Sequence, residues 1–169
     1  QKLSAFCHVR PEAVFSTHDV PNIYHVPLML EEQGFCDILD IDCNKTGLLA
    51  EWKAMAHRLD ELTEEVNIAM VGKYTDLSDA YLSVIKSLQH AALAVERKLN
   101  IVWIEASDLE DANNAEARGL LRNANGVLVP GGFGDRGIEG KVLAAQYARE
   151  NNVPYLGICL GLQVAAIEF

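Results

Sequence analysis

Hydrophobic and polar positions follow a regular pattern along the second part of the chain, and this pattern predicts strands separated by helices. Four continuous apolar runs predict buried strands, at 66–71, 101–104, 127–129 and 153–158. Apolar residues at steps of three and four predict helices between them, from near Ser78 to Val95, weakly at 115–122, and at 138–150. Strands that are apolar throughout and joined by helices are typical of a parallel sheet covered on both faces. The sequence therefore predicts the α/β class, with a doubly wound parallel sheet.

The first part of the chain follows a different pattern. A short apolar run at 3–9 predicts a strand, and the residues around Pro27 predict a short helix. The stretch that follows carries apolar side chains at helical spacing with charged residues between them, which predicts one amphipathic helix. Because the first segment is too small to bury a core, we interpret 1–45 as the tail of a preceding domain, 46–65 as a linker helix, and 66–169 as part of a second domain.

Composition and charge argue against several kinds of partner. The net charge is −10 and the Lys and Arg residues are scattered, so we expect no nucleic acid to bind. No apolar run reaches the roughly 18 residues of a membrane span, so we expect no membrane insertion. The cysteines contain no C-x-x-C pair and no signal peptide precedes them, which predicts reduced thiols in a cytoplasmic protein and no metal site. The chain lacks an initial Met and ends inside a predicted helix, so we expect it to be cut at both ends.

Cys159 has the setting of a catalytic nucleophile. It stands where the fourth predicted strand turns into a helix, and Gly157 and Gly161 allow the backbone to turn sharply there, as in the G-x-S-x-G elbow. The amino end of the following helix favours a thiolate over a thiol, because its unpaired N–H groups carry partial positive charge. A buried core cysteine is the alternative. The two flanking glycines lead us to favour the nucleophile.

A glycine-rich loop after the third predicted strand can complete such a site. The carboxyl ends of parallel strands meet at one edge of a sheet, so we expect the loop at 130–137 to approach Cys159. Gly131 and Gly132 can present backbone amides to an oxyanion without obstruction by a Cβ, beside the amide of Leu160. A plain turn is the alternative. No base is identified, because all five histidines precede the site and none falls in a loop that is expected to face the cysteine.

Three motifs resemble one family and occur in the expected order. The run from Gly157 to Gln163, G-x-C-x-G-x-Q, resembles the nucleophile motif of class I glutamine amidotransferases, which have a flavodoxin-like fold and hydrolyse glutamine with a Cys-His-Glu triad. Within that group, Val129–Lys141 and Met70–Tyr81 resemble the CTP synthase family, and residues 2–9 followed by 18–24 resemble the end of its synthetase domain. The resemblance covers nearly the whole chain. It implies an incomplete amidotransferase domain preceded by the tail of an α/β synthetase domain.

The resemblance also implies roles for particular residues. Cys159 would be the nucleophile that forms the glutamyl thioester, and Gly132 with the Leu160 amide would hold the oxyanion. The residues implied to bind the oxyanion or glutamine are Gly131, Gly132, Leu160, Gly161, Leu162 and Gln163. The residues implied to contact nucleotide in the synthetase remnant are Lys2, His18, Asp19 and Val20.

For the complete enzyme, the resemblance implies ATP-driven amination of UTP to CTP with ammonia from glutamine. It further implies Mg²⁺ as a cofactor, GTP as an allosteric activator, and a homotetramer that forms filaments. The triad His and Glu and the body of the synthetase domain are absent from this chain, so we expect the chain to be inactive by itself and to hold no cofactor of its own. Two alternatives stay open: a stand-alone cysteine hydrolase or redox sensor of the same α/β superfamily, and a non-catalytic assembly segment.

Overall fold

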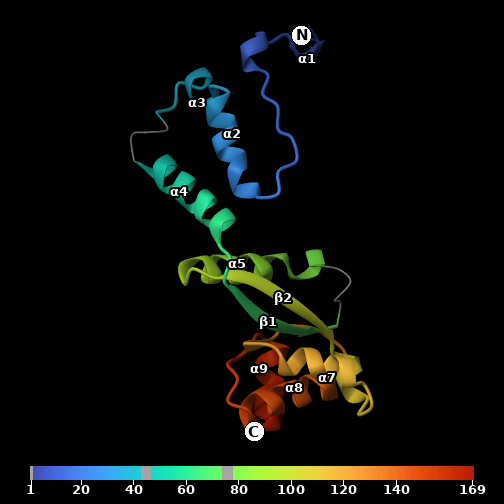
Figure 1. Cartoon of the computed structure of the whole chain (residues 1–169). Coiled ribbons are helices and arrows are strands. Elements are labelled where there is room, and N and C mark those ends of the chain that lie inside the picture. The colour runs from blue at the N-terminus through green and yellow to red at the C-terminus, as the bar shows by residue number, and fades with distance from the viewer. Residues whose placement is uncertain (1, 43–46, 74–77) are drawn as a thin grey trace. The chain divides into compact units, whose positions relative to one another are not determined.

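The computed structural model describes residues 2–42, 47–73 and 78–169 (Figure 1). The chain divides into two compact units, Gln1–Leu62 and Thr63–Phe169. The predicted nucleophile and the glycine-rich loop both belong to the second unit, so the candidate chemistry lies within one body.

All regular secondary structure in the described residues of the first unit is helical. Its elements are α1 (Lys2–Cys7), the 3-10 helices η1 (Pro11–Ala13) and η2 (Ile23–His25), α2 (Val26–Glu32), α3 (Phe35–Ile38) and α4 (Leu48–Glu61). Several hydrogen bonds tie η2 and its N-cap Asn22 to α4. The Asn22 side-chain amide donates to the Ala56 carbonyl (3.0 Å), and the Trp52 indole donates to the Tyr24 carbonyl (2.7 Å). Helix α4 lies inside the range predicted for a linker helix; its role as an interdomain linker, like the predicted domain boundaries, stays a prediction.

Two expectations for the first unit are wrong. The apolar run at 3–9 contributes to helix α1 and the turn after it, not to a strand. A short apolar run has no periodicity that separates a strand from a helix, and the described residues of this unit contain no strand with which it could pair. Cys36 is disulfide-bonded, whereas the sequence predicts reduced thiols; Cys7 and Cys159 are free. The lack of a C-x-x-C pair does not exclude a bond between cysteines farther apart in the chain.

The second unit is built on a parallel sheet of four strands. The strands are β1 (Glu65–Gly72), β2 (Lys98–Glu105), β3 (Gly126–Val129) and β4 (Tyr155–Gly157), in the order β2-β1-β3-β4. In the register, Met70 of β1 lies opposite Trp103 of β2 and Leu128 of β3. The predicted α/β class and doubly wound parallel sheet are confirmed, and this strand order is the one found in flavodoxin-like folds.

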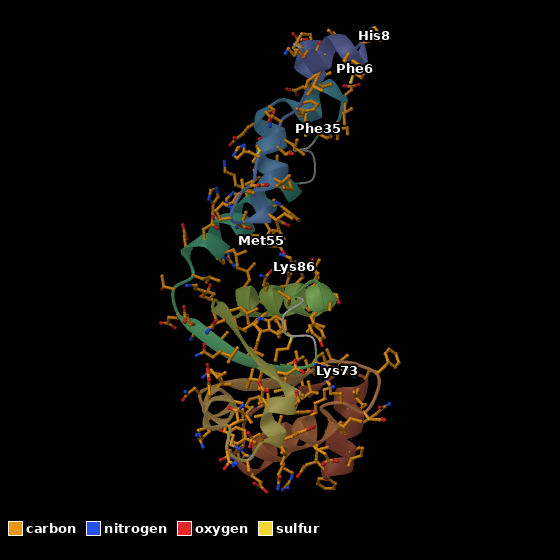
Figure 2. All side chains as sticks on the ribbon, turned by 90° about the vertical axis from the view of Figure 1, so that its right-hand side faces the viewer. Phe6, His8, Phe35, Met55, Lys73 and Lys86 are labelled. Atoms are coloured by element: carbon orange, nitrogen blue, oxygen red, sulfur yellow. The ribbon has the colours of Figure 1, made fainter. Side chains whose placement is uncertain are left out.

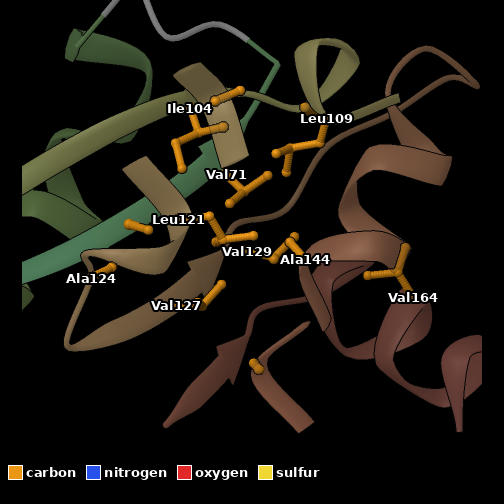
Figure 3. Close-up of a cluster of buried hydrophobic side chains, with 13 residues drawn as sticks. Val71, Ile104, Leu109, Leu121, Ala124, Val127, Val129, Ala144 and Val164 are labelled. Atoms are coloured by element: carbon orange, nitrogen blue, oxygen red, sulfur yellow. The ribbon is translucent and has the colours of Figure 1, made fainter. Parts of the chain in front are cut away.

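Helices cover both faces of this sheet (Figure 1). They are η3 (Ser78–Tyr81), α5 (Leu82–Ala94), α6 (Ala106–Glu110), α7 (Ala115–Arg122), α8 (Ile138–Glu150) and α9 (Leu160–Glu168). On one face, Met70 and Leu128 pack with Tyr81 and with apolar side chains of α5. On the other face, Val71 and Val129 belong to a buried cluster to which α6, α7, α8 and α9 also contribute (Figure 3). Side chains that alternate between two buried faces explain why these strands are apolar throughout.

The order of the strands creates a switch point between β1 and β3. The chain leaves β1 toward β2 on one side and later returns to β3 on the other side. In such sheets, ligands bind in the crevice at the carboxyl ends of the strands beside the switch point. The loops that begin at Lys73 and at Pro130 leave the two strands at that place.

Most element boundaries in the second unit agree with the sequence pattern. The helices predicted at 115–122 and 138–150 are α7 and α8. Helix α6 was not predicted, because it lies in a polar stretch with little periodicity. Strand β4 is shorter than the predicted 153–158, because Pro154 has no N–H to donate to the ladder.

Candidate active site

Cys159 lies at the sharp turn between β4 and α9. Its backbone has φ 52° and ψ −104°, outside the main regions open to a residue with a Cβ. Cys159 is the N-cap of α9, its side chain is exposed, and its thiol is free. The amides of Leu162 and Gln163 both donate to its carbonyl at 3.1 Å, so the first turn of the helix holds the strained residue in place. A free, exposed thiol at the amino end of a helix on a strained turn has the geometry of a nucleophile elbow.

Gly157 and Gly161 are required by close backbone contacts in this turn. A Cβ on Gly157 would overlap the backbone of Gly161, and a Cβ on Gly161 would overlap the carbonyl oxygen of Val129. The Ile158 amide donates to that same Val129 carbonyl at 3.0 Å. The Tyr155 hydroxyl donates to the Gly161 carbonyl at 2.7 Å, and burial raises the pKa of Tyr155 to about 12, so this donor keeps its proton at neutral pH. These contacts give the steric reason for both glycines of the G-x-C-x-G motif.

The glycine-rich loop after β3 approaches the cysteine, as the sequence predicts. A Cβ placed on Gly131 would lie 3.5 Å from the Cβ of Cys159, in ordinary van der Waals contact. A Cβ placed on Gly132 would lie 3.6 Å from the side chain of Leu160. As the first residue of α9, Leu160 has an amide with no acceptor inside the helix. The structure therefore brings four predicted residues, Gly131, Gly132, Cys159 and Leu160, together at one edge of the sheet.

Two basic side chains link the same loop to the neighbouring strand ends. The ammonium of Lys73, which follows β1, donates to the Phe133 carbonyl at 2.9 Å (Figure 2 labels Lys73). The Arg136 guanidinium donates to the Lys73 carbonyl at 3.0 Å and to the Glu105 carboxylate at 2.8 Å. The conformation of the glycine-rich loop is therefore linked to the ends of β1 and β2.

Lys141 is a residue of this site that the sequence reasoning missed. It lies near the start of α8, is 1% exposed, and its Nζ is 3.6 Å from the position of a Cβ on Gly132. Burial lowers the pKa of Lys141, the charge of Lys73 lowers it further, and the Glu105 carboxylate acts in the opposite direction. The available signal was a lysine followed directly by an apolar helical run, but spacing alone does not tell which way such a side chain points.

The remaining predicted residues are distributed over both units. In α9, Gly161 is buried, whereas Leu162 and Gln163 are exposed. His90, the histidine of the second unit, is exposed on α5. The residues predicted to contact nucleotide all belong to the first unit, with Lys2 on α1 and the stretch His18, Asp19 and Val20 between η1 and η2.

Other kinds of site find little support in the described part of the chain. No described helix is both long and apolar enough to cross a membrane. Among the same residues, no three His, Cys, Asp or Glu side chains gather in a way that could hold a metal ion. A hollow of about 210 Å³ lies between α6, α7 and α8, and none of the predicted site residues lines it.

The model of a family described as "Glutamine amidotransferase class-I" matches residues 76–169. The chain belongs to the class-I glutamine amidotransferase family. The amidotransferase match includes the glycine-rich loop and the cysteine elbow, and a second family model, described as "CTP synthase N-terminus", matches residues 1–43.

Individual relatives agree with both matches. A CTP synthase of Dictyostelium discoideum is 50% identical over 193 residues, which cover 100% of this chain and 34% of the relative. CTP synthase 1 of Homo sapiens is 50% identical over 182 residues, which cover 100% of this chain and 31% of the relative. The chain thus spans about a third of the length of these curated relatives. The resemblance to the CTP synthase family is confirmed.

A solved structure is similar to part of the chain. It is described as "Trypanosoma brucei CTPS - glutaminase domain with bound acivicin", and it matches with a TM-score of 0.57 and 49% identity, over 61% of this chain and 39% of that chain. The match supports the α/β fold with its parallel sheet. The roles assigned to individual residues are not tested by these likenesses and stay predictions.

Proposed function

We propose that this chain is part of a glutamine-dependent CTP synthase and supplies the nucleophile and the oxyanion loop of its glutaminase site. The observation that carries the proposal is the position of Cys159. Its free, exposed thiol stands on a strained turn, and the Gly131 backbone lies within van der Waals distance of it. A buried core cysteine, the alternative, has neither the strain nor the exposure.

In the proposed reaction, the Cys159 sulfur attacks the side-chain carbonyl carbon of glutamine. The carbonyl oxygen gains negative charge, and the amides of Gly132 and Leu160 are the donors best placed to stabilise it. The C–N bond then breaks, the nitrogen leaves as ammonia with the proton given up by the thiol, and a glutamyl thioester remains. Water hydrolyses the thioester to glutamate and restores the thiol.

The proposal also covers the use of the ammonia. In the full-length protein, ATP would activate UTP and ammonia would convert it to CTP, with Mg²⁺ as a cofactor and GTP as an allosteric activator. The described residues offer no cluster of metal ligands, so we assign no step of the reaction to Mg²⁺ in this chain. Lys2 and the stretch His18–Val20 stay the proposed nucleotide contacts of the first unit. A cytoplasmic homotetramer that forms filaments belongs to the same proposal.

The printed sequence has no His-Pro-Glu-like segment that could supply the rest of a triad. We therefore expect these 169 residues by themselves not to turn over glutamine. The identity to CTP synthases over both units favours this function over a stand-alone hydrolase or redox sensor and over a purely structural segment.

The test replaces the nucleophile in the full-length protein. Cys159→Ala should abolish glutamine-dependent CTP formation, by at least about 10³-fold, because no thioester can form. CTP formation from added ammonium ions should stay within about twofold of wild type, because that reaction bypasses the cysteine. Cys7→Ala, at an exposed free cysteine of the first unit, is the matched control and should leave both rates unchanged.

A covalent probe gives an independent result. A diazo-ketone analogue of glutamine should label Cys159 in the wild-type protein and leave no label in Cys159→Ala, as read by peptide mass spectrometry. Glutamine-dependent activity that survives the Cys159→Ala change, or a label on another residue, would contradict the proposed site.

A further inference from the structure

The burial of Lys141 is unusual and has no evident packing reason. Lysine is almost never fully buried unless it has a partner, because its ammonium loses its hydration. Lys141 is nevertheless 1% exposed, and the four residues that follow it in α8, Val142 to Ala145, are apolar. Among the described residues, its ammonium makes no ion pair within 4.0 Å and no side-chain hydrogen bond. A methionine or leucine would fill the same space without the cost of desolvating a charge.

The ammonium lies against the loop that borders the nucleophile. Its Nζ is 3.6 Å from the position of a Cβ on Gly132, at the same distance as the Leu160 side chain. Gly132 therefore stands between α8, which carries Lys141, and the first turn of α9, which follows the cysteine. A charge at this place acts directly on the peptide groups of the loop.

Several charged groups from neighbouring elements face the ammonium. The facing groups are Lys73 after β1, Glu105 at the end of β2, Arg136 in the loop, and Glu110 of α6, which accepts a hydrogen bond from the Gly140 amide. Glu105 is already paired with Arg136 at 2.8 Å. Strand β3 and residues 160–167 of α9 contribute no charged side chain. Asp135 lies in the loop itself, so charges of both signs surround the ammonium.

The direction of one peptide group decides whether the loop can bind an oxyanion. The described peptide bonds are all trans, so the Gly131 carbonyl and the Gly132 amide point in opposite directions. If the amide points toward the substrate oxygen, the carbonyl must point into the protein. An ammonium beside Gly132 attracts that carbonyl oxygen and disfavours the flipped peptide, in which the N–H would face the positive charge.

We propose that Lys141 is a positioning residue for glutamine hydrolysis, whose ammonium keeps the Gly132 amide directed at the oxyanion. The inference rests on the proposed glutaminase function and adds a residue to it. Its positive charge also raises the potential at the place where the carbonyl oxygen of glutamine becomes negative. Lys141 does not touch the substrate in this account; it acts through the loop.

The test compares three variants of the full-length protein. Lys141→Met keeps the length of the side chain and removes the charge, whereas Lys141→Arg keeps the charge. The matched control is Lys98→Met, which removes an exposed lysine of β2 that pairs with Glu65 of β1. For Lys141→Met, we expect kcat for glutamine-dependent CTP formation to fall by about tenfold or more, the usual range for a residue that orients a catalytic group. KM for glutamine and the ammonium-dependent rate should stay within about twofold. Lys141→Arg should recover part of kcat, and Lys98→Met should match wild type.

Two alkylating agents separate positioning from general packing. A diazo-ketone analogue of glutamine needs the oxyanion donors to react with Cys159, whereas iodoacetamide needs only an accessible thiol. Lys141→Met should slow the first reaction by the same factor as kcat and leave the second within about twofold. If Lys141→Met slows both alkylation reactions equally, or slows neither of them, the inference is overturned.

The wild-type protein gives a readout that does not depend on any variant folding. Because burial and Lys73 lower the pKa of Lys141, the ratio of the two alkylation rates should fall as pH rises into the range where this ammonium loses its proton. A flat ratio up to the alkaline unfolding of the protein overturns the inference. If Cys159→Ala retains glutamine-dependent activity, the proposed function fails; if that variant is inactive and Lys141→Met equals wild type, only the role of Lys141 fails.

Discussion

Gly161→Ala is the most direct perturbation of the cysteine elbow. A Cβ at this position would meet three atoms of Val129: it would overlap the carbonyl oxygen, lie 2.9 Å from the carbonyl carbon, and lie 3.1 Å from the Cβ. Two of these atoms are backbone atoms of β3, which is a buried central strand. The contact cannot be relieved by a side-chain rotation, so α9 and the Cys159 turn must move away from β3.

The size of that movement sets the expected effect. Opening these contacts to normal distances needs a displacement on the order of 1 Å, and a misplacement of this size costs about 10²-fold in rate when it separates catalytic groups. We therefore expect Gly161→Ala to lower glutamine-dependent kcat by about 10²-fold. Overpacking of this kind costs about 1–3 kcal/mol of folding free energy, so the variant should still fold.

The assay is the rate of glutamine-dependent CTP formation beside the ammonium-dependent rate in the same preparation. The ammonium-dependent rate should change little, because it does not use the elbow. Gly119→Ala is the matched control: Gly119 lies in α7, a Cβ there has nothing within 4 Å, and the change should be neutral or slightly stabilising. A Gly161→Ala protein with wild-type glutamine-dependent activity would refute the steric reasoning and the elbow with it.

Two further predictions concern the contacts around the same turn and helix. Tyr155→Phe removes the hydroxyl that donates to the Gly161 carbonyl and should lower the free energy of unfolding by about 1 kcal/mol in denaturant titrations; an unchanged midpoint would contradict it. Arg149 hydrogen bonds hold the pKa of Glu168 below its usual 4.5, so the stability from this pair is present above that pH and is lost as pH falls through the lowered value. Thermal unfolding of Glu168→Gln should therefore show lower stability than wild type at neutral pH and a smaller loss of stability as the pH falls. The same pH dependence in both proteins would contradict a stabilising role for this pair.

The sequence determined much of the second unit by itself. Continuous apolar runs joined by amphipathic helices require a parallel sheet with two covered faces, and the alternating burial of Met70 and Val71 on opposite faces bears this out. The sequence also predicted the role of the elbow glycines, because few turns other than a sharp strand-to-helix turn need glycine at both Gly157 and Gly161. The strand predicted at 3–9 was wrong because a short apolar segment shows no clear periodicity, and its secondary structure depends on the segments that pack against it.

Only the tertiary structure decided which side chains converge behind the loop. Lys73, Glu105 and Arg136 follow or end different elements, and their hydrogen bonds exist because the strand order places the ends of β1, β2 and β3 side by side. The burial of Lys141 depends on the packing of α8 against the sheet, which no local pattern contains. Local periodicity fixes the type of each element, whereas the partners of a polar side chain depend on contacts between segments far apart in the chain.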